Sequence, residues 1–334
     1  MNAQALLCDA QQQFSLREVV LPEPGPQHVV VHTLYTGVSV GTEFALIRGK
    51  LNWGPYPLCT GYQGVGVIER AGADVQGFKV GDRVYFRDNR TIALPDGQKV
   101  SGVSGTHCSH AVIEVGKTHG LALLPAGVDE AAASLFVLAA VGLYGVDLAS
   151  PRMGQTVLVH GAGMIGLASV AALSHRGCRV ISVDLDDQRL ALARKLGADE
   201  TINAAREDLK QAAARLCPNG ADVVFESTGI PACLDPAISL CKWKGVFVWQ
   251  GNYGQAPVSL HFLPAHGKQL TMYFPCDDGM APCRTAVLKN MAKGVLPWQE
   301  TITHRVPAAE APALYTAINH GPVAGLIGAV IRWA

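Results

Sequence analysis

The stretch TVLVHGAGMIG, residues 156–166, decides the fold of the central part of the chain. Five residues typical of a buried strand run directly into the pattern G-x-G-x-x-G, and helix-favouring residues follow. At such a junction Gly161 permits a tight turn, Gly163 lets the backbone approach a pyrophosphate, and Gly166 lets the helix pack on the sheet. The stretch therefore predicts a dinucleotide-binding turn, in which the helix N-terminus at Met164 and Ile165 holds the phosphate charge.

Strands and helices alternate outward from this turn. Further strands are expected at residues 179–183, 222–226 and 245–250, and a helix at 188–196 ends at Gly197. This alternation predicts an α/β fold with a doubly wound parallel sheet.

An acidic residue follows the second of these strands. Asp184 lies 18 positions after Gly166 (184 − 166), where a carboxylate accepts hydrogen bonds from ribose hydroxyls. The same charge repels a 2′-phosphate, so the sequence favours NAD over NADP. Arg189 weakens this interpretation, because a nearby arginine can also serve a phosphate.

The first 120 residues have a different pattern. Strands at 29–34, 64–69, 80–86 and 109–115, separated by Gly and Pro turns, predict a small barrel. After them, Asp129 and Glu130 are expected to cap one long apolar helix that includes residues 131–146. Mixed structure returns from about residue 282.

Composition excludes several classes of protein. Lys+Arg and Asp+Glu both number 27, so no charge field attracts nucleic acid or an anionic membrane. The apolar run 131–146 is shorter than the roughly 20 residues of a membrane span, and the first residues do not resemble a signal peptide. Nine scattered cysteines without a C-x-x-C pair predict a reduced, cytoplasmic protein. The charged fraction of only 16% suggests buried surface beyond one monomer, hence a homodimer or homotetramer.

Three further motifs precede the dinucleotide turn: GVSVGTE at 37–43, GYQGVG at 61–66 and VGDRV at 80–84. Together with the turn they resemble the medium-chain dehydrogenase/reductase superfamily of zinc-type alcohol dehydrogenases. The resemblance implies a GroES-like β-barrel catalytic domain at 1–124 and 288–334, and a Rossmann NAD-binding domain at 125–287. It also implies that two loops after strands border the cofactor, and these contain Ser227, Thr228, Gln250, Gly251 and Asn252.

The chain departs from this family where zinc would bind. Zinc-dependent members carry a Cys before Gly-Thr-Asp/Glu and a Gly-His-Glu motif, whereas here these positions are Val40, Tyr62 and Gln63. Valine has no donor atom, and neither tyrosine nor glutamine is a usual zinc ligand. We therefore expect no metal site. Through Ser39–Glu43, Tyr56–Tyr62 and a closing segment with Trp333, the chain resembles the bacteriochlorophyllide a dehydrogenase subgroup, which supports zinc-less alcohol oxidation more than any particular alcohol.

Without zinc, hydrogen-bonding groups must stabilise the alkoxide. The resemblance places Thr42 at the family's hydroxyl relay position and Tyr62 in the space of a metal-binding histidine. We expect Tyr62 to act as the acid/base, Thr42 as a relay, and Gln63 and Glu43 as positioning groups. A structural salt bridge is the competing interpretation for Glu43.

The leading hypothesis is a zinc-independent, NAD-dependent dehydrogenase that exchanges a hydride with a secondary alcohol or its ketone, of polyol or carbohydrate-like type. One alternative is an NAD(P)H-dependent reductase of quinones or enones, against which Asp184 argues. The other is a non-catalytic nucleotide-binding relative, because loss of all zinc ligands is what decay would produce.

Overall fold

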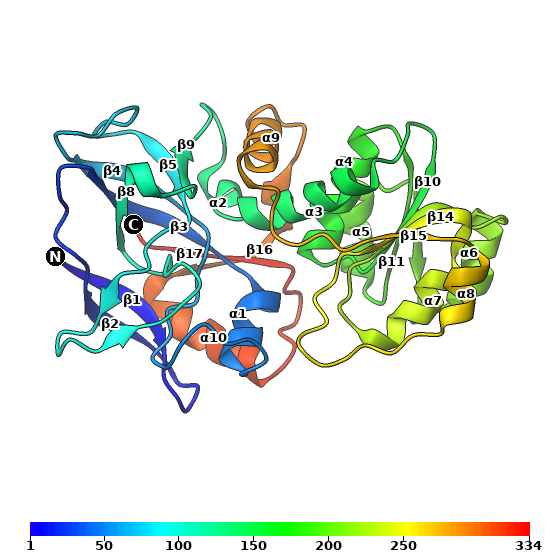
Figure 1. Cartoon of the computed structure of the whole chain (residues 1–334), viewed down its shortest axis with the longest axis horizontal. Coiled ribbons are helices and arrows are strands. Elements are labelled where there is room, and N and C mark those ends of the chain that lie inside the picture. The colour runs from blue at the N-terminus through cyan, green and yellow to red at the C-terminus, as the bar shows by residue number, and fades with distance from the viewer. The chain divides into compact units, whose positions relative to one another are not determined.

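The computed structural model describes residues 1–334, and these form two compact units (Figure 1). Unit 1 comprises Met1–Phe136 and Leu288–Ala334, and unit 2 comprises Val137–Val287. The two ends of the chain therefore belong to one unit. No helix combines the length and the apolar character needed to span a bilayer.

Unit 1 is built mainly from strands, in two sheets. Its elements are β1 (Asn2–Cys8), β2 (Phe14–Val20), β3 (His28–Val38), α1 (Val40–Ile47), β4 (Gly64–Ala71), β5 (Arg83–Phe86), β6 (Ile92–Ala93), β7 (Lys99–Val100), β8 (His110–Glu114), η1 (Val115–Lys117), β9 (Leu121–Leu123), α2 (Glu130–Ala133), η3 (Trp298–Thr301), β16 (Ile302–Pro307), η4 (Ala308–Glu310), α10 (Ala311–His320) and β17 (Gly328–Arg332).

The long strand β3 organises the larger sheet of unit 1. That sheet has the order β16-β17-β3-β4-β5-β9, with β8 also paired to β3, and a four-stranded sheet has the order β1-β2-β6-β7. β17, near the C-terminus, runs antiparallel to β3 and pairs with its second half. A cluster of buried side chains that includes Phe44 of α1 and Tyr315 of α10 packs beside these strands and holds the two helices in place.

Unit 2 contains one parallel sheet and its flanking helices, of which α3 begins at Phe136 of unit 1 and α9 ends at Ala292 of unit 1. Its elements are α3 (Phe136–Ala149), β10 (Thr156–His160), α4 (Met164–His175), β11 (Arg179–Asp184), α5 (Asp187–Lys195), β12 (Glu200–Asn203), α6 (Leu209–Leu216), β13 (Ala221–Glu226), η2 (Pro231–Cys233), α7 (Leu234–Ser239), β14 (Cys241–Trp249), α8 (Phe262–Gly267), β15 (Thr271–Tyr273) and α9 (Met280–Ala292).

The sheet of unit 2 confirms the predicted α/β fold. Six parallel strands follow the order β12-β11-β10-β13-β14-β15, so the chain winds outward in both directions from β10. Figure 1 shows helices on both sides of this sheet. Because every strand is parallel, the carboxyl ends of the strands lie on one edge, where such sheets bind ligands.

The expectation of one continuous helix through residues 131–146 was wrong. Asp129 caps the start as predicted, since its Oδ1 accepts a hydrogen bond from the Ala132 N–H at 2.7 Å. The helix then breaks at Ser134, whose hydroxyl donates to the Ala131 carbonyl at 2.7 Å. A serine that bonds to the preceding turn competes with the helix ladder, so α2 ends there and α3 starts anew.

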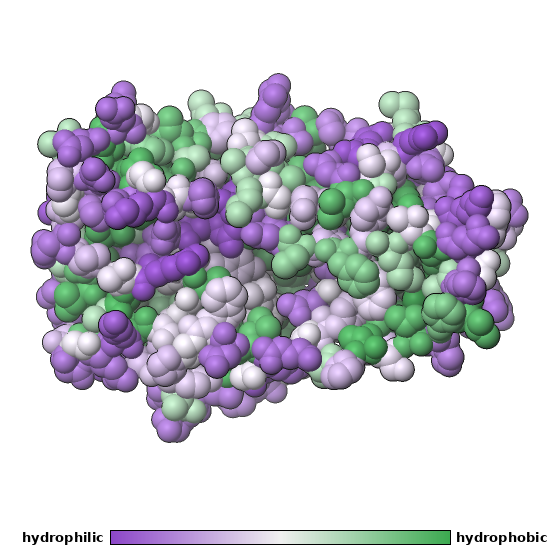
Figure 2. Space-filling model, in the orientation of Figure 1, coloured by the Kyte–Doolittle hydropathy of each residue, from purple (hydrophilic) through white to green (hydrophobic).

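Unit 2 also exposes large hydrophobic side chains near one edge of its sheet. Phe262 and Leu263 of α8 are 67% and 75% exposed, and Phe274, directly after the edge strand β15, is 67% exposed. Figure 2 shows hydrophobic side chains gathered on the surface over α7 and α8. Exposed groups of this size mark a contact surface more often than an isolated apolar residue does.

Candidate active site

The turn after β10 has the backbone geometry that the glycine pattern predicts. Gly161 has φ +99°, a conformation that favours glycine. A Cβ at Gly166 would lie only 1.8 Å from the Gly161 carbonyl oxygen, so α4 packs directly against the turn. A Cβ at Gly163 would meet nothing closer than Arg189 Nη1 at 3.8 Å, which leaves open space beside this residue.

The start of α4 presents backbone donors to this open space. Gly163 is the N-cap and has no side chain to bond the first N–H groups. The N–H groups of the first helical turn, including those of Met164 and Ile165, lack partners within the helix and attract anions. The turn therefore fits the pyrophosphate of a dinucleotide.

Asp184 ends β11 beside the same turn and is held rigidly. Its Oδ2 accepts a hydrogen bond from the Ala162 N–H at 2.7 Å, and its Oδ1 accepts from the N–H groups of Leu185 and Asp186 at 2.8 and 3.1 Å. Arg189 lies across the turn, with Nη1 3.5 Å from the Ala162 carbonyl oxygen. The structure thus places a fixed negative charge and a neighbouring guanidinium at the site predicted for the ribose.

Two loops follow β13 and β14 at this edge of the sheet. The Ser227 N–H donates to the His160 carbonyl, which ties the first loop to the dinucleotide turn. The two loops pack together so closely that a Cβ at Gly251 would lie 2.4 Å from the Gly229 nitrogen. Thr228 donates both its N–H and its hydroxyl to Glu226, a fully buried carboxylate.

Gln250 and Asn252 occupy different environments in the second loop. The Gln250 carboxamide turns toward α3, where its Nε2 donates to the Val141 carbonyl at 3.2 Å. Its side chain is therefore used inside unit 2, and only its backbone continues the loop. Asn252 Oδ1 accepts from the Gly254 N–H at 2.8 Å and shapes the turn that follows.

In unit 1, the Tyr62 phenol lies among hydroxyl groups. Hydrogen bonds from Ser39 and Thr42 reach it, although burial dominates and raises the pKa of Tyr62 to about 12. The Arg87 guanidinium carbon lies 5.6 Å from the centre of the Tyr62 ring, and Arg87 Nε donates to the Tyr62 carbonyl at 3.1 Å. Tyr62 is thus a buried, protonated phenol connected to two side-chain hydroxyls.

Gln63, the next residue, is fully buried beside β3. Its carbonyl accepts from the Gly37 N–H at 3.2 Å and from the Thr106 hydroxyl at 3.4 Å. A Cβ at Gly37 would lie 2.4 Å from the Ser134 carbonyl oxygen, so this position tolerates no side chain. Gln63 therefore joins the segment that contains Tyr62 to the central strand of the sheet.

Glu43 is the centre of a closed hydrogen-bond network, which we call the Glu43 network. Its Oε1 accepts from the Ser39 N–H at 2.7 Å. Its Oε2 lies 2.6 Å from Thr60 Oγ1, 3.0 Å from His107 Nε2 and 2.7 Å from the Tyr315 hydroxyl. All four donors are directed at one buried carboxylate, so the hydrogen-bonding capacity of Glu43 is used inside unit 1.

The electrostatics of the Glu43 network follow from these contacts. Burial alone would raise the pKa of Glu43, but the charge of His107 and the hydrogen bonds from His107, Ser39 and Thr60 hold it below its ordinary value. Burial, together with the Glu43 charge, raises the pKa of Tyr315 well above its ordinary value. Glu43 is therefore ionised near neutral pH, while Tyr315 stays protonated.

The outer members of this network come from distant parts of the chain. His107 Nδ1 lies 2.8 Å from the Thr36 hydroxyl, which also accepts from Trp333 Nε1 at 2.9 Å. Sequence reasoning missed the roles of His107, Tyr315 and Thr36. Glu43 and Tyr315 are 272 positions apart, and no local pattern predicts that they meet.

The residues at the family's zinc positions do not fit a zinc ion. Val40 offers no donor atom, Tyr62 is a protonated phenol, and Gln63 offers only a carboxamide. Zinc in proteins is bound by cysteine sulfur, histidine nitrogen or carboxylate oxygen.

Comparison with known proteins identifies the family. The alcohol dehydrogenase GroES-like domain matches residues 25–125, and the zinc-binding dehydrogenase domain matches residues 165–283. The sorbitol dehydrogenase of Halalkalibacterium halodurans is 29% identical over 323 residues, which cover 92% of this chain and 93% of that protein. The L-threonine 3-dehydrogenase of Burkholderia vietnamiensis is 30% identical over 251 residues, covering 70% of this chain and 72% of that protein.

Solved structures share the fold at lower identity. A dehydrogenase from Sinorhizobium meliloti 1021 bound to NADP has a TM-score of 0.85 and 23% identity, with both chains fully covered. The rspB alcohol dehydrogenase of Escherichia coli CFT073 in complex with NADH has a TM-score of 0.83 and 22% identity, with 99% of each chain covered.

The chain belongs to the medium-chain dehydrogenase/reductase superfamily, whose alcohol and polyol dehydrogenases are oxidoreductases that act on CH–OH groups with a nicotinamide cofactor. The predicted architecture, a GroES-like domain with a Rossmann domain, is thereby confirmed.

Proposed function

We propose that this protein is a zinc-independent, NAD-dependent dehydrogenase that interconverts a secondary alcohol of polyol or carbohydrate type and its ketone. The observation that supports this best is the Tyr62 phenol, which contacts Ser39 and Thr42 at a position where zinc-dependent relatives have a metal-binding histidine. The relatives named sorbitol dehydrogenase and 2R,3R-butanediol dehydrogenase support a hydroxylated substrate of this kind.

The choice of cofactor rests on Asp184. When bound, the nicotinamide supplies or accepts the hydride. The turn at Gly161–Gly166 and the first residues of α4 would hold the pyrophosphate, and Asp184 would accept hydrogen bonds from the ribose. Three backbone N–H groups fix the carboxylate of Asp184, so it cannot swing away from a 2′-phosphate. This rigidity favours NAD over NADP.

The protonation state of Tyr62 defines its task. With a pKa of about 12, the phenol is protonated near neutral pH and donates a hydrogen bond. In ketone reduction it gives its proton to the carbonyl oxygen as the hydride reaches the carbon. Thr42 then relays a proton to the phenolate, giving its hydroxyl proton while it takes up another from water. In alcohol oxidation the same proton transfers occur in the opposite direction. The rate of oxidation then rises with pH, because the phenol must lose its proton before it can accept one from the alcohol.

The remaining predicted residues support this phenol. Glu43 reaches back to the Ser39 N–H at 2.7 Å and fixes the start of α1, which carries Thr42. Gln63 anchors the segment after Tyr62 to β3 through its backbone carbonyl. Both act on Tyr62 through the backbone and make no contact with substrate in this proposal.

We place the protein in the cytoplasm as a homo-oligomer. Seven of its nine cysteines are buried and all are unpaired, which suits a reducing compartment. The exposed Phe274 follows the edge strand β15, whose free edge can pair with a second copy. Sedimentation velocity measures the state directly, and a monomer at micromolar concentration would contradict this assignment.

The decisive experiment compares wild type with Tyr62→Phe in a chelator-treated preparation. NADH formation is followed with NAD⁺ and with NADP⁺ against sorbitol, butanediol and other secondary alcohols. We expect activity with NAD⁺ that survives chelation. Tyr62→Phe should lower kcat by about 10²–10⁴-fold while the Kd for NADH stays unchanged.

Tyr56→Phe is the matched control, because the Tyr56 hydroxyl only donates to the Ile47 carbonyl at 2.9 Å. Its kcat should equal that of the wild type. Activity that chelation abolishes and added zinc restores, with the Kd for NADH unchanged throughout, would contradict zinc independence. An unchanged kcat in Tyr62→Phe would remove Tyr62 from the mechanism.

A further inference from the structure

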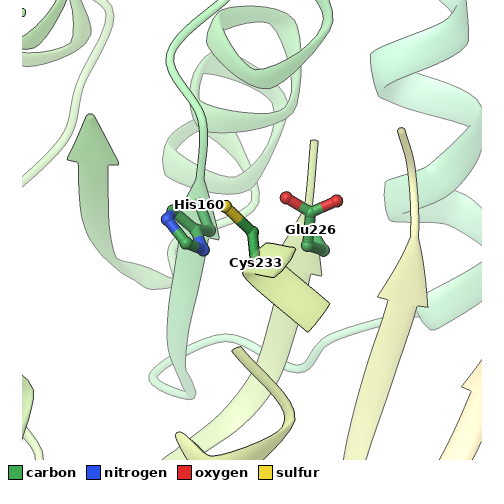
Figure 3. Close-up of side chains that lie close together, drawn as sticks. All are labelled: His160, Glu226 and Cys233. Atoms are coloured by element: carbon green, nitrogen blue, oxygen red, sulfur yellow. The ribbon is translucent and has the colours of Figure 1, made fainter. Parts of the chain in front are cut away.

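Unit 2 gathers an imidazole, a carboxylate and a thiol at the carboxyl edge of its sheet. His160 is the last residue of β10, Glu226 is the last residue of β13, and Cys233 ends η2. β10 and β13 pair directly, with His160 opposite Glu226. One ligand atom from each of the three side chains lies within 4.8 Å of the other two (Figure 3).

A second observation concerns a buried nitrogen atom of His160. Its side chain is only 8% exposed, and the buried Nδ1 has no hydrogen-bond partner. Leaving such a polar atom unsatisfied costs about 1–3 kcal/mol, so native proteins rarely do so without a reason. Figure 3 shows the Cys233 thiol pointing toward the His160 ring, with Glu226 on the other side of the thiol.

The donor set selects the class of ligand. One histidine nitrogen, one cysteine sulfur and one carboxylate oxygen match the three protein ligands of an open tetrahedral zinc site. Magnesium and calcium prefer oxygen ligands alone. Hydrogen bonds from Thr228 and Tyr253 already orient the Glu226 carboxylate, as outer hydrogen bonds orient carboxylates that bind metals.

We propose that His160, Glu226 and Cys233 bind one divalent cation of the zinc class. The site belongs to unit 2 and is independent of Val40, Tyr62 and Gln63 in unit 1. His160 directly precedes the dinucleotide turn, and Cys233 lies in the segment after β13. A cation bound to both residues therefore connects the end of β10 to that segment. Zinc found in the purified protein is then held here and does no chemistry at Tyr62.

Cobalt serves as the probe, because thiolate ligation to Co²⁺ gives a charge-transfer absorption band. Chelator-treated full-length protein is titrated with Co²⁺ under reducing conditions, and then with Zn²⁺. Cys233→Ser removes the half-buried thiol of the site, and Cys276→Ser removes the exposed cysteine elsewhere in unit 2 as the matched control. Circular dichroism verifies that both variants are folded.

We expect one Co²⁺ per wild-type chain, a thiolate band, and displacement by Zn²⁺. Cys233→Ser should lose the band and bind Co²⁺ at least about 10–100-fold more weakly, whereas Cys276→Ser should match the wild type. Absence of the band in the wild type, or its persistence in Cys233→Ser, would overturn the site. Neither result bears on Tyr62, so this inference and the proposed function fail separately.

Discussion

Unit 1 surrounds its buried carboxylate with donors, whereas the carboxyl edge of the sheet in unit 2 leaves buried polar atoms without partners. Glu43 accepts from Ser39, Thr60, His107 and Tyr315. At the edge in unit 2, His160 Nδ1 and Ser227 Oγ are buried and make no hydrogen bond.

We infer from this difference that the Glu43 network stabilises the fold of unit 1, whereas the carboxyl edge of the sheet in unit 2 binds ligands. A carboxylate whose oxygens already accept four hydrogen bonds has no lone pair left for a substrate. If it is removed, its donors stay buried without an acceptor. An unsatisfied edge is tolerated where a ligand completes it. Changes in the Glu43 network should therefore affect stability, and changes at the edge should affect binding.

The largest effect is expected from Glu43→Ala. The substitution leaves His107, Tyr315 and Thr60 buried without their common acceptor, and we expect a loss of about 3–5 kcal/mol in the free energy of unfolding. Urea denaturation measures it. Glu69→Ala is the control, because this exposed carboxylate pairs only with His32 and His110 at the surface, where a pair contributes about 0–1 kcal/mol. Equal losses in the two variants would contradict the central role of the Glu43 network.

The second largest effect is expected at alkaline pH, where ionisation of the buried Tyr62 phenol should lower the free energy of unfolding. The pKa of Tyr62 rises from 10.0 to about 12 on folding. Its stabilising contribution is therefore complete below pH 10.0 and is lost as the pH rises through about 12. At about 1.4 kcal/mol for each pKa unit, the full loss is about 3 kcal/mol.

This dependence is measured as urea midpoints between about pH 9 and about pH 11. The midpoint of the wild type should fall more steeply with pH than that of Tyr62→Phe, which lacks the titrating hydroxyl. Parallel slopes would mean that Tyr62 ionises equally in the folded and unfolded states.

A smaller effect, on binding alone, is expected from Gly163→Ala. Gly163 has φ −72°, which alanine adopts freely, and the new methyl group meets only Arg189 Nη1 at 3.8 Å. We expect the affinity for NADH to fall by about tenfold or more, or about 1.4 kcal/mol, with little change in unfolding. Fluorescence titration measures the Kd.

Gly166→Ala is the contrasting variant in the same turn. Its methyl group would lie 1.8 Å from the Gly161 carbonyl oxygen, so it should destabilise unit 2 as well as weaken binding. If Gly163→Ala binds NADH as the wild type does, the open space beside Gly163 is not where the phosphate lies.

The smallest effect concerns the choice of cofactor. Asp184→Asn removes the charge and keeps an oxygen for the Ala162 N–H, while its amide nitrogen replaces the oxygen that accepts from Leu185 and Asp186. The affinity for NADPH should rise relative to NADH by about tenfold, or about 1.4 kcal/mol. Titrations with both cofactors measure the ratio. An unchanged ratio would assign cofactor selection to Arg189 or to other residues.

The predictable parts of the molecule are those whose signals are local. The strand, turn and helix around Gly161, Gly163 and Gly166 are adjacent in sequence, so their pattern is enough to predict the parallel sheet and its dinucleotide turn. The break at Ser134 was missed because hydrophobicity alone cannot show a serine that bonds to the preceding helical turn. The sequence also could not show that the Gln250 side chain bonds to the Val141 carbonyl of α3, whereas the prediction that its loop borders the cofactor stays a prediction.

The sequence by itself determined the α/β class, the dinucleotide turn, the acidic residue at the end of β11, and the residue types Val40, Tyr62 and Gln63 at the positions where the resemblance places zinc ligands. Only the tertiary structure decided that Glu43 is enclosed by His107 and Tyr315, and that His160, Glu226 and Cys233 meet. The physical reason is distance along the chain. Neighbouring residues interact through backbone geometry and propensity, whereas residues many positions apart are brought together only by strand pairing and helix packing across a whole unit.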